Sequence, residues 1–377
     1  MSRVVVAMSG GVDSAVAASL LVEQGHEVIG ITMQIWPEGK QVPATARGCC
    51  SIDAVEDARR VCAALEVPHY VLNMREDFSR TVIDDFIHEY RAGRTPNPCV
   101  QCNRHIKFDA LMDRAEALGA RWVATGHYAR TCFNEETGRW ELRRARDHSK
   151  DQTYVLYPLT QRQLSMSLFP LADWVKDDAR RRAADLGLRV AWKADSQEIC
   201  FVPDRDYSKF LESVDPDVVR PGLIVDTSGK VRGEHRGIAF FTVGQRKGLG
   251  VASNSPLYVT RIDPKNDLVI IGEDAEVRSD ACTVENVNWI GIPPPDRRIA
   301  VLARIRYNMH EAPAAVEPLA DGKWVLRFQD AQRAITPGQS AVFYDDDQVL
   351  GGGTIGSVLE SDTSVTNDHL FGLVQKR

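Results

Sequence analysis

The chain has 377 residues, a length typical of two or three domains. Hydrophobic residues make up 44% and charged residues 26% of it, and this ordinary mixture excludes a mainly disordered protein. The formal net charge of −6 excludes a protein that coats nucleic acid through its overall charge, so a polyanionic partner must meet a local basic surface.

The sequence lacks the patterns of membrane and secreted proteins. No apolar run approaches the roughly 18 to 20 residues that cross a bilayer, and the run from Val4 to Ala7 is too short for the core of a signal peptide. The eight cysteines are sparse and lack the spacing of a disulfide scaffold. We therefore expect a cytoplasmic protein without a membrane partner, in which clustered thiols serve metal binding or catalysis.

Short apolar runs alternate with amphipathic stretches in the first third of the chain. The apolar runs predict strands at Val4 to Met8, Val28 to Met33, His69 to Asn73 and Trp122 to Thr125. The stretches between them predict helices at Ala15 to Gln24, Asp53 to Leu65, Phe78 to Tyr90 and Phe108 to Leu118. This alternation is typical of an α/β domain with a doubly wound parallel sheet, which we assign to residues 1–206. Ligands of such sheets bind at the carboxyl ends of the strands.

The loop after the first predicted strand, Ser9 to Ser14, has the sequence Ser-Gly-Gly-Val-Asp-Ser. Its glycines allow a tight turn with inward N–H groups, and the start of the next helix adds a positive dipole end, which together suit an anion. The alternative is an ordinary turn in which Ser or Asp only caps the helix. Neither Gly-x-x-x-x-Gly-Lys-Ser/Thr nor Gly-x-Gly-x-x-Gly occurs, which disfavours kinases and dinucleotide-binding proteins. The segment resembles the pyrophosphate loop of PP-loop ATPases, which split ATP into AMP and pyrophosphate.

A second segment places Cys99 and Cys102 three positions apart, after a stretch stiffened by Pro96 and Pro98. Such a pair in a cytosolic protein is half of a metal site or a reactive thiol pair. A structural zinc ion needs four ligands, and no second Cys-x-x-Cys is present. Cys200, after a polar run, is a further candidate. Neighbouring basic residues favour thiolate over thiol: Arg94, Arg104, His105 and Lys107.

The pattern changes after about residue 206, where short apolar runs and Gly, Pro or Asp turns replace the long helices. Runs in residues 207–274 predict a small β-rich central domain with strands at Gly222 to Asp226, Ala239 to Val243, Leu257 to Ile262 and Leu268 to Ile271. Alternating runs at Val301 to Tyr307 and Trp324 to Phe328 predict a C-terminal β-barrel domain over residues 275–377. Arg246 and Lys247 lie between glycines and suit contacts to phosphate.

Further segments occur in the order typical of one enzyme family. They are Gly-Cys-Cys-Ser (48–51), Thr-Pro-Asn-Pro (95–98), Ala-Thr-Gly-His-Tyr-Ala (124–129), Lys-Asp-Gln-Thr-Tyr (150–154), Asp-Ser-Gln-Glu-Ile-Cys-Phe (195–201) and Phe-Thr-Val-Gly-Gln-Arg-Lys-Gly-Leu-Gly (241–250). Together with the glycine loop they resemble the tRNA-specific 2-thiouridylases, which replace O2 of the wobble uridine of tRNA with sulfur. The resemblance implies an enzyme that uses ATP and Mg²⁺, adenylates O2 of the uridine, and obtains sulfur from a sulfur-donor or sulfur-relay protein. We expect a monomer.

The resemblance also implies the roles of particular residues. ATP is expected to contact Ala7, Met8, Ser9, Gly10, Gly11, Val12, Asp13, Ser14, Met33 and Gly126, with Asp13 near the magnesium ion. The tRNA is expected to contact Asn97, Pro98, Cys99, His127, Lys150, Asp151, Gln152, Arg306, Tyr307 and Gln339, in addition to Arg246 and Lys247. Cys102 is implied as the first catalytic cysteine and Cys200 as the carrier of the incoming persulfide.

The sequence departs from the family at Cys99, where many members have aspartate. With Cys99 as a third catalytic thiol, a 4Fe-4S iron–sulfur cluster ligated by Cys99, Cys102 and Cys200 is an alternative to a cluster-free persulfide route. The sequence leaves both routes open. Two other functions also remain. The thiols disfavour an amidotransfer ligase of the PP-loop class, and the intact glycine loop disfavours a zinc-stabilised RNA-binding adaptor.

Overall fold

The computed structural model describes residues 1–36, 52–193, 199–202 and 206–359. The segments 48–51 and 195–198 therefore lie outside the described residues. The chain forms two compact units, each described by itself. The first comprises residues 1–83, 98–207 and 347–349, and the second comprises residues 84–97, 208–346 and the chain from 350 onward.

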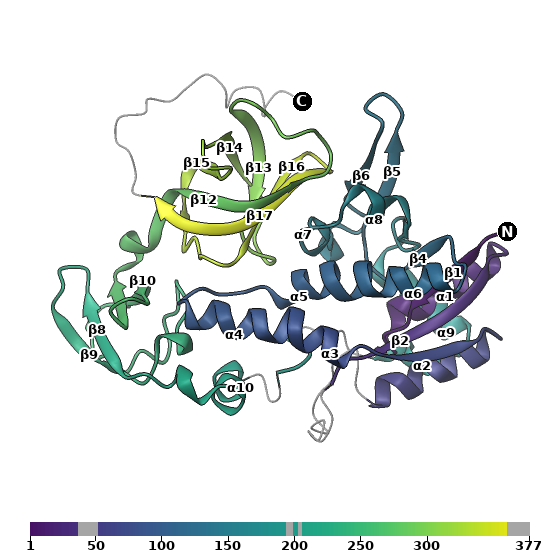
Figure 1. Cartoon of the computed structure of the whole chain (residues 1–377), viewed down its shortest axis with the longest axis horizontal. Coiled ribbons are helices and arrows are strands. Elements are labelled where there is room, and N and C mark those ends of the chain that lie inside the picture. Colours follow the sequence, from purple (N-terminus) through teal and green to yellow (C-terminus); the bar gives the residue numbers. More distant parts are fainter. Residues whose placement is uncertain (37–51, 194–198, 203–205, 360–377) are drawn as a thin grey trace. The chain divides into compact units, whose positions relative to one another are not determined.

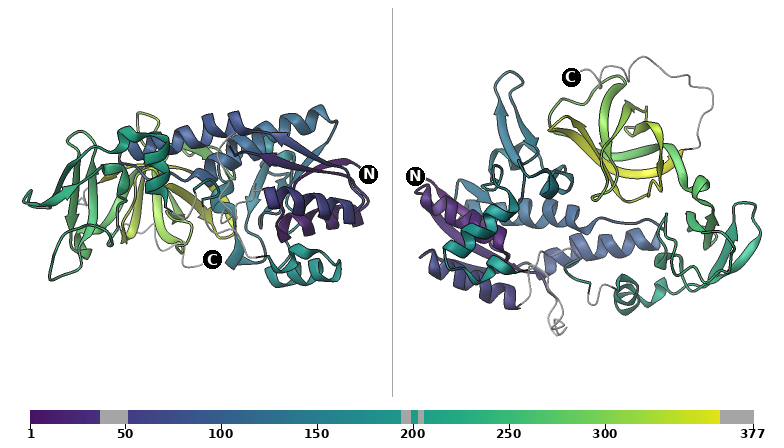
Figure 2. Two further views of the ribbon diagram at one scale, coloured as in Figure 1. Left: turned by 90° about the horizontal axis from the view of Figure 1, so that it is seen from below. Right: turned by 180° about the vertical axis from the view of Figure 1, so that it is seen from behind.

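A parallel sheet with the strand order β3-β2-β1-β4-β7 forms the centre of the first unit (Figure 1). Its strands are β1 (Arg3–Ala7), β2 (Glu27–Gln34), β3 (His69–Asn73), β4 (Trp122–Ala124) and β7 (Ser167–Leu168). Val4, Val6 and Met8 of the central region pack with apolar residues of α1, α2 and α9, while α6 packs against β4. Helices cover both faces (Figure 2), which is why β1 and β2 are continuous apolar runs.

The helices of this unit confirm the predicted alternation. They are α1 (Val12–Glu23), α2 (Ile52–Ala64), α3 (Arg75–Phe78), η1 (Ser79–Ile83), α5 (Pro98–Gln101), η2 (Cys102–Ala110), α6 (Leu111–Ala117), η3 (His148–Lys150), α7 (Thr153–Leu156), α8 (Gln161–Ser165), α9 (Lys176–Asp185) and η4 (Arg189–Trp192). The predicted doubly wound parallel sheet is therefore correct.

The sequence did not predict the hairpin of β5 (Arg130–Asn134) and β6 (Arg139–Arg143), which projects from the first unit (Figure 1). Its strands are short and carry many polar residues, so their hydrophobic alternation is weak. Gln348 and Val349 pair with Arg143 and Leu142 of β6. The hairpin thus gains a third strand from a segment more than 200 residues away in the sequence, as the pair of Arg143 with Asp347 also illustrates.

The second unit contains the mixed sheet β10-β11-β8-β9, in which β11 and β8 are parallel. Its strands are β8 (Gly222–Asp226), β9 (Val231–His235), β10 (Tyr258–Asp263) and β11 (Leu268–Gly272), and its helical segments are α4 (Asp84–Arg91), α10 (Tyr207–Val214), η6 (Pro216–Val218), η7 (Ile238–Phe240) and η8 (Asp274–Val277). The predicted strand at Ala239 to Val243 is wrong, because η7 occupies its first part. All but one of its residues are buried, and a continuous buried run does not distinguish a strand from a helical turn.

A closed antiparallel barrel completes the second unit, with the strand order β12-β15-β14-β13-β16-β17 and pairing between β12 and β17. Its strands are β12 (Arg278–Trp289), β13 (Ile299–Arg304), β14 (Ala312–Pro318), β15 (Trp324–Arg333), β16 (Ser340–Asp345) and β17 (Gln348–Leu359). Trp289 contacts Trp324 and Phe343 in its core, with ring centroids 4.8 and 5.6 Å away. The predicted C-terminal barrel is confirmed, whereas the domain boundaries at residues 206 and 274 stay a prediction.

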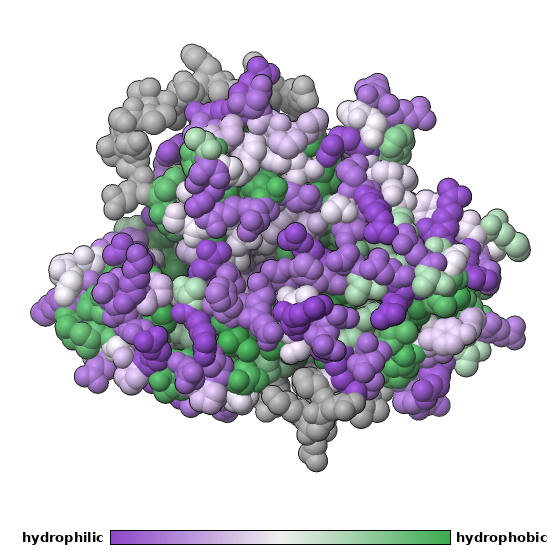
Figure 3. Space-filling view, in the orientation of Figure 1, coloured by the Kyte–Doolittle hydropathy of each residue, from purple (hydrophilic) through white to green (hydrophobic). Residues whose placement is uncertain are grey.

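Within the described ranges, no helix combines the length and apolar character that crossing a membrane requires. The face shown in Figure 3 is mostly hydrophilic, and its hydrophobic residues form separate patches.

Candidate functional site

The turn between β1 and α1 lies at the carboxyl edge of the parallel sheet, where ligands of this fold class bind. Gly10 has a φ of +65°, a left-handed conformation that residues with a Cβ rarely adopt. A Cβ at Gly10 would also lie 2.2 Å from the carbonyl oxygen of Ala54 in α2. Both the conformation and the available space therefore require glycine at this position.

Hydroxyl groups hold the turn from inside. The Ser14 hydroxyl accepts a hydrogen bond from the backbone N–H of Ser9 at 3.2 Å and donates one to the carbonyl oxygen of Gly11 at 3.1 Å. Gly11 is the N-cap of α1, and no described side chain caps this end of the helix. The capping explanation of the serines and the aspartate is therefore wrong. An uncapped helix start beside a glycine turn directs N–H groups at one point, as an anion site does.

Neighbouring strands complete this edge of the sheet. Gly126 follows β4, and a Cβ there would lie 2.6 Å from backbone atoms of Asp13 and Ser14. Met33 is buried near the end of β2, whose Ile31 pairs with Ala7 of β1. The structure thus gathers the residues predicted to hold ATP along one edge: Ala7, Met8, Ser9, Gly10, Gly11, Val12, Asp13, Ser14, Met33 and Gly126.

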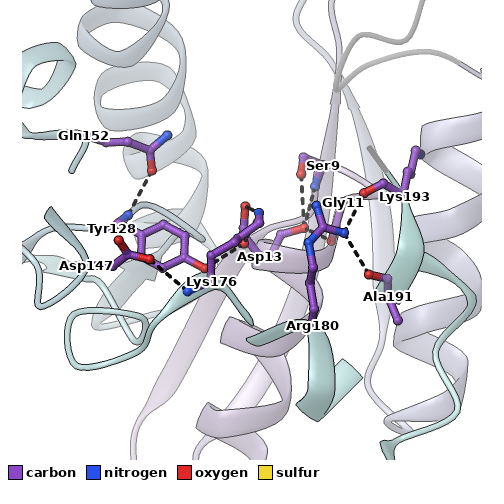
Figure 4. Close-up of polar contacts among 11 residues, drawn as sticks. Ser9, Gly11, Asp13, Tyr128, Asp147, Gln152, Lys176, Arg180, Ala191 and Lys193 are labelled. Carbon is purple, nitrogen blue, oxygen red and sulfur yellow. Dashed lines mark hydrogen bonds and ion pairs between the residues drawn. The ribbon is translucent and has the colours of Figure 1, made fainter. Parts of the chain in front are cut away.

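The carboxylate of Asp13 already has two partners (Figure 4). Lys176 Nζ donates to both of its oxygens, at 2.8 and 2.7 Å, and the Tyr128 hydroxyl donates to Oδ1 at 3.1 Å. Lys176 is only 7% exposed. The carboxylate and the hydroxyls of the turn are hard oxygen donors of the type that Mg²⁺ prefers, so the site fits this ion. A metal ion at Asp13 would share the carboxylate with the lysine.

A second lysine binds the turn itself. Lys193 Nζ donates to the carbonyl oxygen of Gly10 at 2.9 Å and to Asp57 Oδ2 at 2.8 Å. Arg180 in turn donates to the carbonyl oxygens of Ala191 and Lys193, each at 3.0 Å, and so holds the segment that carries this lysine (Figure 4).

Reasoning from the sequence missed Lys176, Lys193 and Tyr128 as site residues. Their partners in the turn are 163, 183 and 115 residues away in the sequence. No local motif marks the two lysines. Tyr128 has a weak signal, since it lies in the Ala-Thr-Gly-His-Tyr-Ala segment next to Gly126.

The thiols of the Cys-x-x-Cys segment lie on consecutive helical segments of the first unit. Cys99 in α5 is exposed, and Cys102 is half-buried at the start of η2, a π-helix, a geometry that is rare and often found at functional sites. Cys200 is also half-buried, and its neighbour Phe201 packs edge-on against Phe78 of α3 at 5.6 Å. Because α3 also packs against η2, the segments of Cys200 and Cys102 both contact this short helix.

The arrangement of the thiols bears on metal binding. Across residues 1–36, 52–193, 199–202 and 206–359, no three His, Cys, Asp or Glu side chains stand together as a metal site requires. Cys99, Cys102 and Cys200 are all within these ranges. These thiols therefore do not form a preassembled site for a single metal ion such as zinc, and the 4Fe-4S cluster stays a prediction.

The charges around Cys102 differ from the expectation. Burial, and secondarily the Arg104 guanidinium, lower the pKa of His105, so its ring is neutral at neutral pH. Arg94 belongs to the second unit and is paired with Glu89 at 2.8 Å.

Among the predicted RNA contacts of the first unit, Lys150 ends η3, and Asp151 and Gln152 form the turn that joins η3 to α7. Lys150 is half-buried. The buried Asp151 accepts a hydrogen bond from the Thr153 hydroxyl at 2.8 Å. Gln152 Oε1 accepts one from the backbone N–H of Tyr128 at 2.9 Å. This turn therefore connects directly to the residue that contacts Asp13.

His127 lies in the interior instead. It is 7% exposed, and its Nδ1 lies 2.7 Å from the Thr125 hydroxyl. Burial, and to a lesser extent the Lys107 ammonium, hold the pKa of His127 well below its usual range. A buried, neutral ring offers RNA little surface, so its predicted RNA contact stays a prediction.

In the second unit, Arg246 and Lys247 are exposed in the loop that precedes β10. Arg306 instead donates to the carbonyl oxygen of Ala334 at 2.6 Å and to the Thr336 hydroxyl at 2.9 Å. Tyr307 is 39% exposed beside it. Arg306 therefore has structural partners in the barrel, and the Tyr307 ring lies 5.5 Å from the Arg304 guanidinium, whereas Arg246 and Lys247 are exposed; their RNA contacts stay predictions.

Gln339 ties the barrel to the segment that leads into Cys99. Its Nε2 donates to the carbonyl oxygens of Thr95 and Pro96, at 2.9 and 3.1 Å. The Thr95 N–H donates to the carbonyl oxygen of Pro337 at 2.8 Å. Asn97 follows half-buried, and Pro98 is the buried first residue of α5.

A parallel sheet covered by helices on both faces, with a glycine turn at its carboxyl edge, defines a nucleotide-binding α/β domain. Comparison with known families agrees with this class. Residues 2–204 match the family model described as the tRNA methyl transferase HUP domain, residues 208–273 match a tRNA methyl transferase PRC-barrel domain, and residues 279–355 match an aminomethyltransferase beta-barrel domain.

Curated relatives match over nearly the whole chain. A tRNA-specific 2-thiouridylase of Heliobacterium modesticaldum is 54% identical over 93% of this chain and 92% of its own length. One of Thermoanaerobacter sp. (strain X514) is 52% identical over 94% of this chain and 98% of its own length. The chain belongs to the tRNA-specific 2-thiouridylase family and is thus an enzyme of the tRNA sulfurtransferase class. The PP-loop type of domain implies the use of ATP with a metal such as Mg²⁺.

Solved structures show a more distant likeness. A 4-thiouridine synthetase in complex with RNA and ATP is 18% identical to this chain, with a TM-score of 0.34 over 57% of this chain and 51% of its own.

Gly126→Ala tests the close contact at the sheet edge. The added Cβ would press on the backbone of Asp13 and Ser14, so we expect weaker ATP binding, by at least tenfold, and a loss of about 1–3 kcal/mol in the free energy of unfolding. Calorimetric titration with ATP and chemical denaturation measure both. Gly233→Ala is the control, since the nearest atom to its Cβ is 3.4 Å away. Unchanged affinity in Gly126→Ala would contradict the assignment.

Thiol alkylation tests the burial of the cysteines. Burial raises the pKa of the Cys62 thiol to about 11 and that of Cys282 to about 12, so both stay protonated at neutral pH. We expect iodoacetamide to modify the exposed Cys99 and to leave the buried Cys62 and Cys282 unmodified in the folded protein, as mass spectrometry of peptides would report. Early labelling of Cys62 or Cys282 in folded protein would contradict this, because it would show that these thiols are accessible to the reagent.

Proposed function

We propose that this protein thiolates the wobble uridine of tRNA with ATP and a protein-supplied sulfur, giving 2-thiouridine, AMP and pyrophosphate. The observation that carries the proposal is the presence, in one unit, of an uncapped helix start beside a glycine turn and of Cys102 at the point where α5 continues into the π-helix η2. The first suits a triphosphate and the second suits sulfur transfer. Membership of the family supports the choice of RNA substrate.

The first step activates a poor leaving group. The carbonyl oxygen O2 of uridine attacks the α-phosphorus of ATP, the bond between the α-phosphorus and the bridging oxygen breaks, and pyrophosphate leaves. N–H groups of the glycine turn and of the start of α1 stabilise the departing negative charge. Asp13 and the hydroxyls of Ser9 and Ser14 are the residues that would hold Mg²⁺, which neutralises phosphate charge when bound.

The second step introduces sulfur. The terminal sulfur of a persulfide on Cys200 attacks C2 of the adenylated uridine, and AMP leaves with the original O2. The Cys102 thiolate then attacks the Cys200 sulfur, breaks the bond to the transferred sulfur and forms a Cys102–Cys200 disulfide. A cellular dithiol must reduce this disulfide before the next cycle. Contact of both cysteine segments with α3 supports this pairing.

Cys99 and the RNA contacts complete the proposal. Cys99 is exposed about one helical turn before Cys102, and its role in the proposal is to contact the reacting base. Arg246 and Lys247 are exposed and suit the phosphates of tRNA, while Lys150 to Gln152, Asn97 and Tyr307 are proposed to contact tRNA nearer the reactive base. A sulfur-donor or sulfur-relay protein would load Cys200.

Cysteine variants test the proposal in an assay with ATP, unmodified tRNA and a persulfide donor. The native protein should release AMP and form 2-thiouridine, detected by mass spectrometry of digested tRNA. Cys102→Ser and Cys200→Ser should lose at least about 99% of thiolation, because each removes one sulfur of the proposed exchange. Cys132→Ser is the matched control, since this thiol lies in the β5–β6 hairpin. Full activity of Cys200→Ala with plain sulfide would contradict an obligatory persulfide.

A charge variant tests the RNA surface. We expect Arg246→Ala plus Lys247→Ala to weaken tRNA binding and to lower the slope of log K against log salt by about 1 for each lost phosphate contact. Filter binding at several salt concentrations measures both. Arg181→Ala plus Arg182→Ala removes the same charge from α9, where these arginines pair with Asp178 and Glu23, and should leave the slope unchanged. Equal slopes for the two variants would overturn this assignment.

A further inference from the structure

Two chains of contacts connect the turn at 147–152 with the Asp13 carboxylate (Figure 4). In the first, the Gln152 side chain accepts a hydrogen bond from the Tyr128 N–H at 2.9 Å, and the Tyr128 hydroxyl donates to Asp13 at 3.1 Å. In the second, Asp147 Oδ2 accepts from the backbone N–H of Lys176 at 3.0 Å, and the ammonium of Lys176 binds Asp13. Both chains start in one short turn and end on one carboxylate.

The connecting residues are buried and tightly held. Tyr128 is 2%, Lys176 7% and Asp147 9% exposed. The Gln152 N–H also donates to the carbonyl oxygen of Tyr128 at 3.0 Å, so these two residues are joined in both directions. Removing the hydrogen-bond partner of a buried polar group destabilises the fold, because water cannot reach the group and replace the partner. A shift of the turn must therefore move Tyr128 and Lys176 or break these bonds.

The hydrogen bonds of Asp147 reinforce the second chain. Burial alone would raise the pKa of its carboxyl, but hydrogen bonds from Ser149 and from the Lys176 backbone outweigh this and lower it. The Ser149 hydroxyl donates to Asp147 Oδ1 at 2.6 Å. The charged carboxylate thus binds the turn through one oxygen and the start of α9 through the other.

We propose that Tyr128 and Lys176 are positioning residues that couple RNA binding at the turn 147–152 to ATP binding at Asp13. This inference rests on the proposed function, which assigns RNA to the turn and ATP to the glycine loop. RNA bound to the turn holds Tyr128 and Lys176, and through them the Asp13 carboxylate, in one position, so ATP then meets a carboxylate that is already placed for it. Coupling between two binding sites is reciprocal, so ATP strengthens RNA binding by the same factor.

Binding measurements test the coupling apart from catalysis. The dissociation constant of α,β-methylene-ATP, whose α–β linkage resists cleavage, is measured calorimetrically with Mg²⁺, with and without saturating unmodified tRNA. We expect tRNA to tighten nucleotide binding by at least about fivefold in the native protein. In Tyr128→Phe, which removes one hydroxyl from a buried ring, and in Lys176→Gln, this factor should fall below about twofold. Lys176→Arg keeps the positive charge beside Asp13, so it should retain part of the native factor.

Tyr70→Phe is the matched control, because it removes the same hydroxyl from a side chain that is 52% exposed on β3, and it should keep the native factor. The inference is overturned if tRNA does not change nucleotide affinity in the native protein, or if folded Tyr128→Phe keeps the full factor. Tyr128→Phe decides the matter alone if Lys176→Gln fails to fold. If the coupling is overturned but the native protein still thiolates tRNA, the proposed function stands. If the native protein fails to thiolate tRNA, the proposed function itself is overturned.

Discussion

The close approach of backbone segments at the carboxyl edge of the parallel sheet is the constraint on which the site depends. Gly10 places its α-carbon against Ala54 of α2, and Gly126 places its own against the start of α1. No side chain fits at either position. Because these contacts involve backbone rather than flexible side chains, they fix the N-terminus of α1 against the ends of β1 and β4 and leave its N–H groups directed at a ligand.

Charge at this edge is balanced within the protein. Asp13 lies where we propose that a triphosphate and a metal ion bind, and the buried Lys176 neutralises its charge. The pair is half-buried, since the Asp13 side chain is 32% exposed and that of Lys176 only 8%, so it contributes little net stability, whereas removing Asp13 would leave a buried ammonium without its partner. The pair is therefore better understood as a device that sets the position and charge of one carboxylate. Lys193 likewise fixes the position of the carbonyl oxygen of Gly10 through a hydrogen bond.

Distant segments of the chain hold the helical run that contains Cys102. The buried Asn103 of η2 donates to the carbonyl oxygen of Val155 in α7, at 2.9 Å, just beyond the turn that reaches Tyr128. In the second unit, Gln339 holds the Thr95–Pro96 backbone from the barrel. Residues implied by family resemblance to contact RNA, such as Arg306 and Gln339, thus also have structural partners in the folded chain.

The sequence by itself determined the parallel α/β domain, the glycine turn and the thiol segment, because each depends on local features: hydrophobic period, glycine conformation and cysteine spacing. It also predicted five of the ten strands that the structure describes after residue 206, namely β8, β10, β11, β13 and β15, but η7 was taken for a strand because a short, continuous buried run carries no period. Only the tertiary structure decided that Lys176, Lys193 and Tyr128 meet the turn and that His127 is buried. Those facts depend on which distant segments come together, and pairing across 100 or more residues leaves no mark in the local pattern on either side.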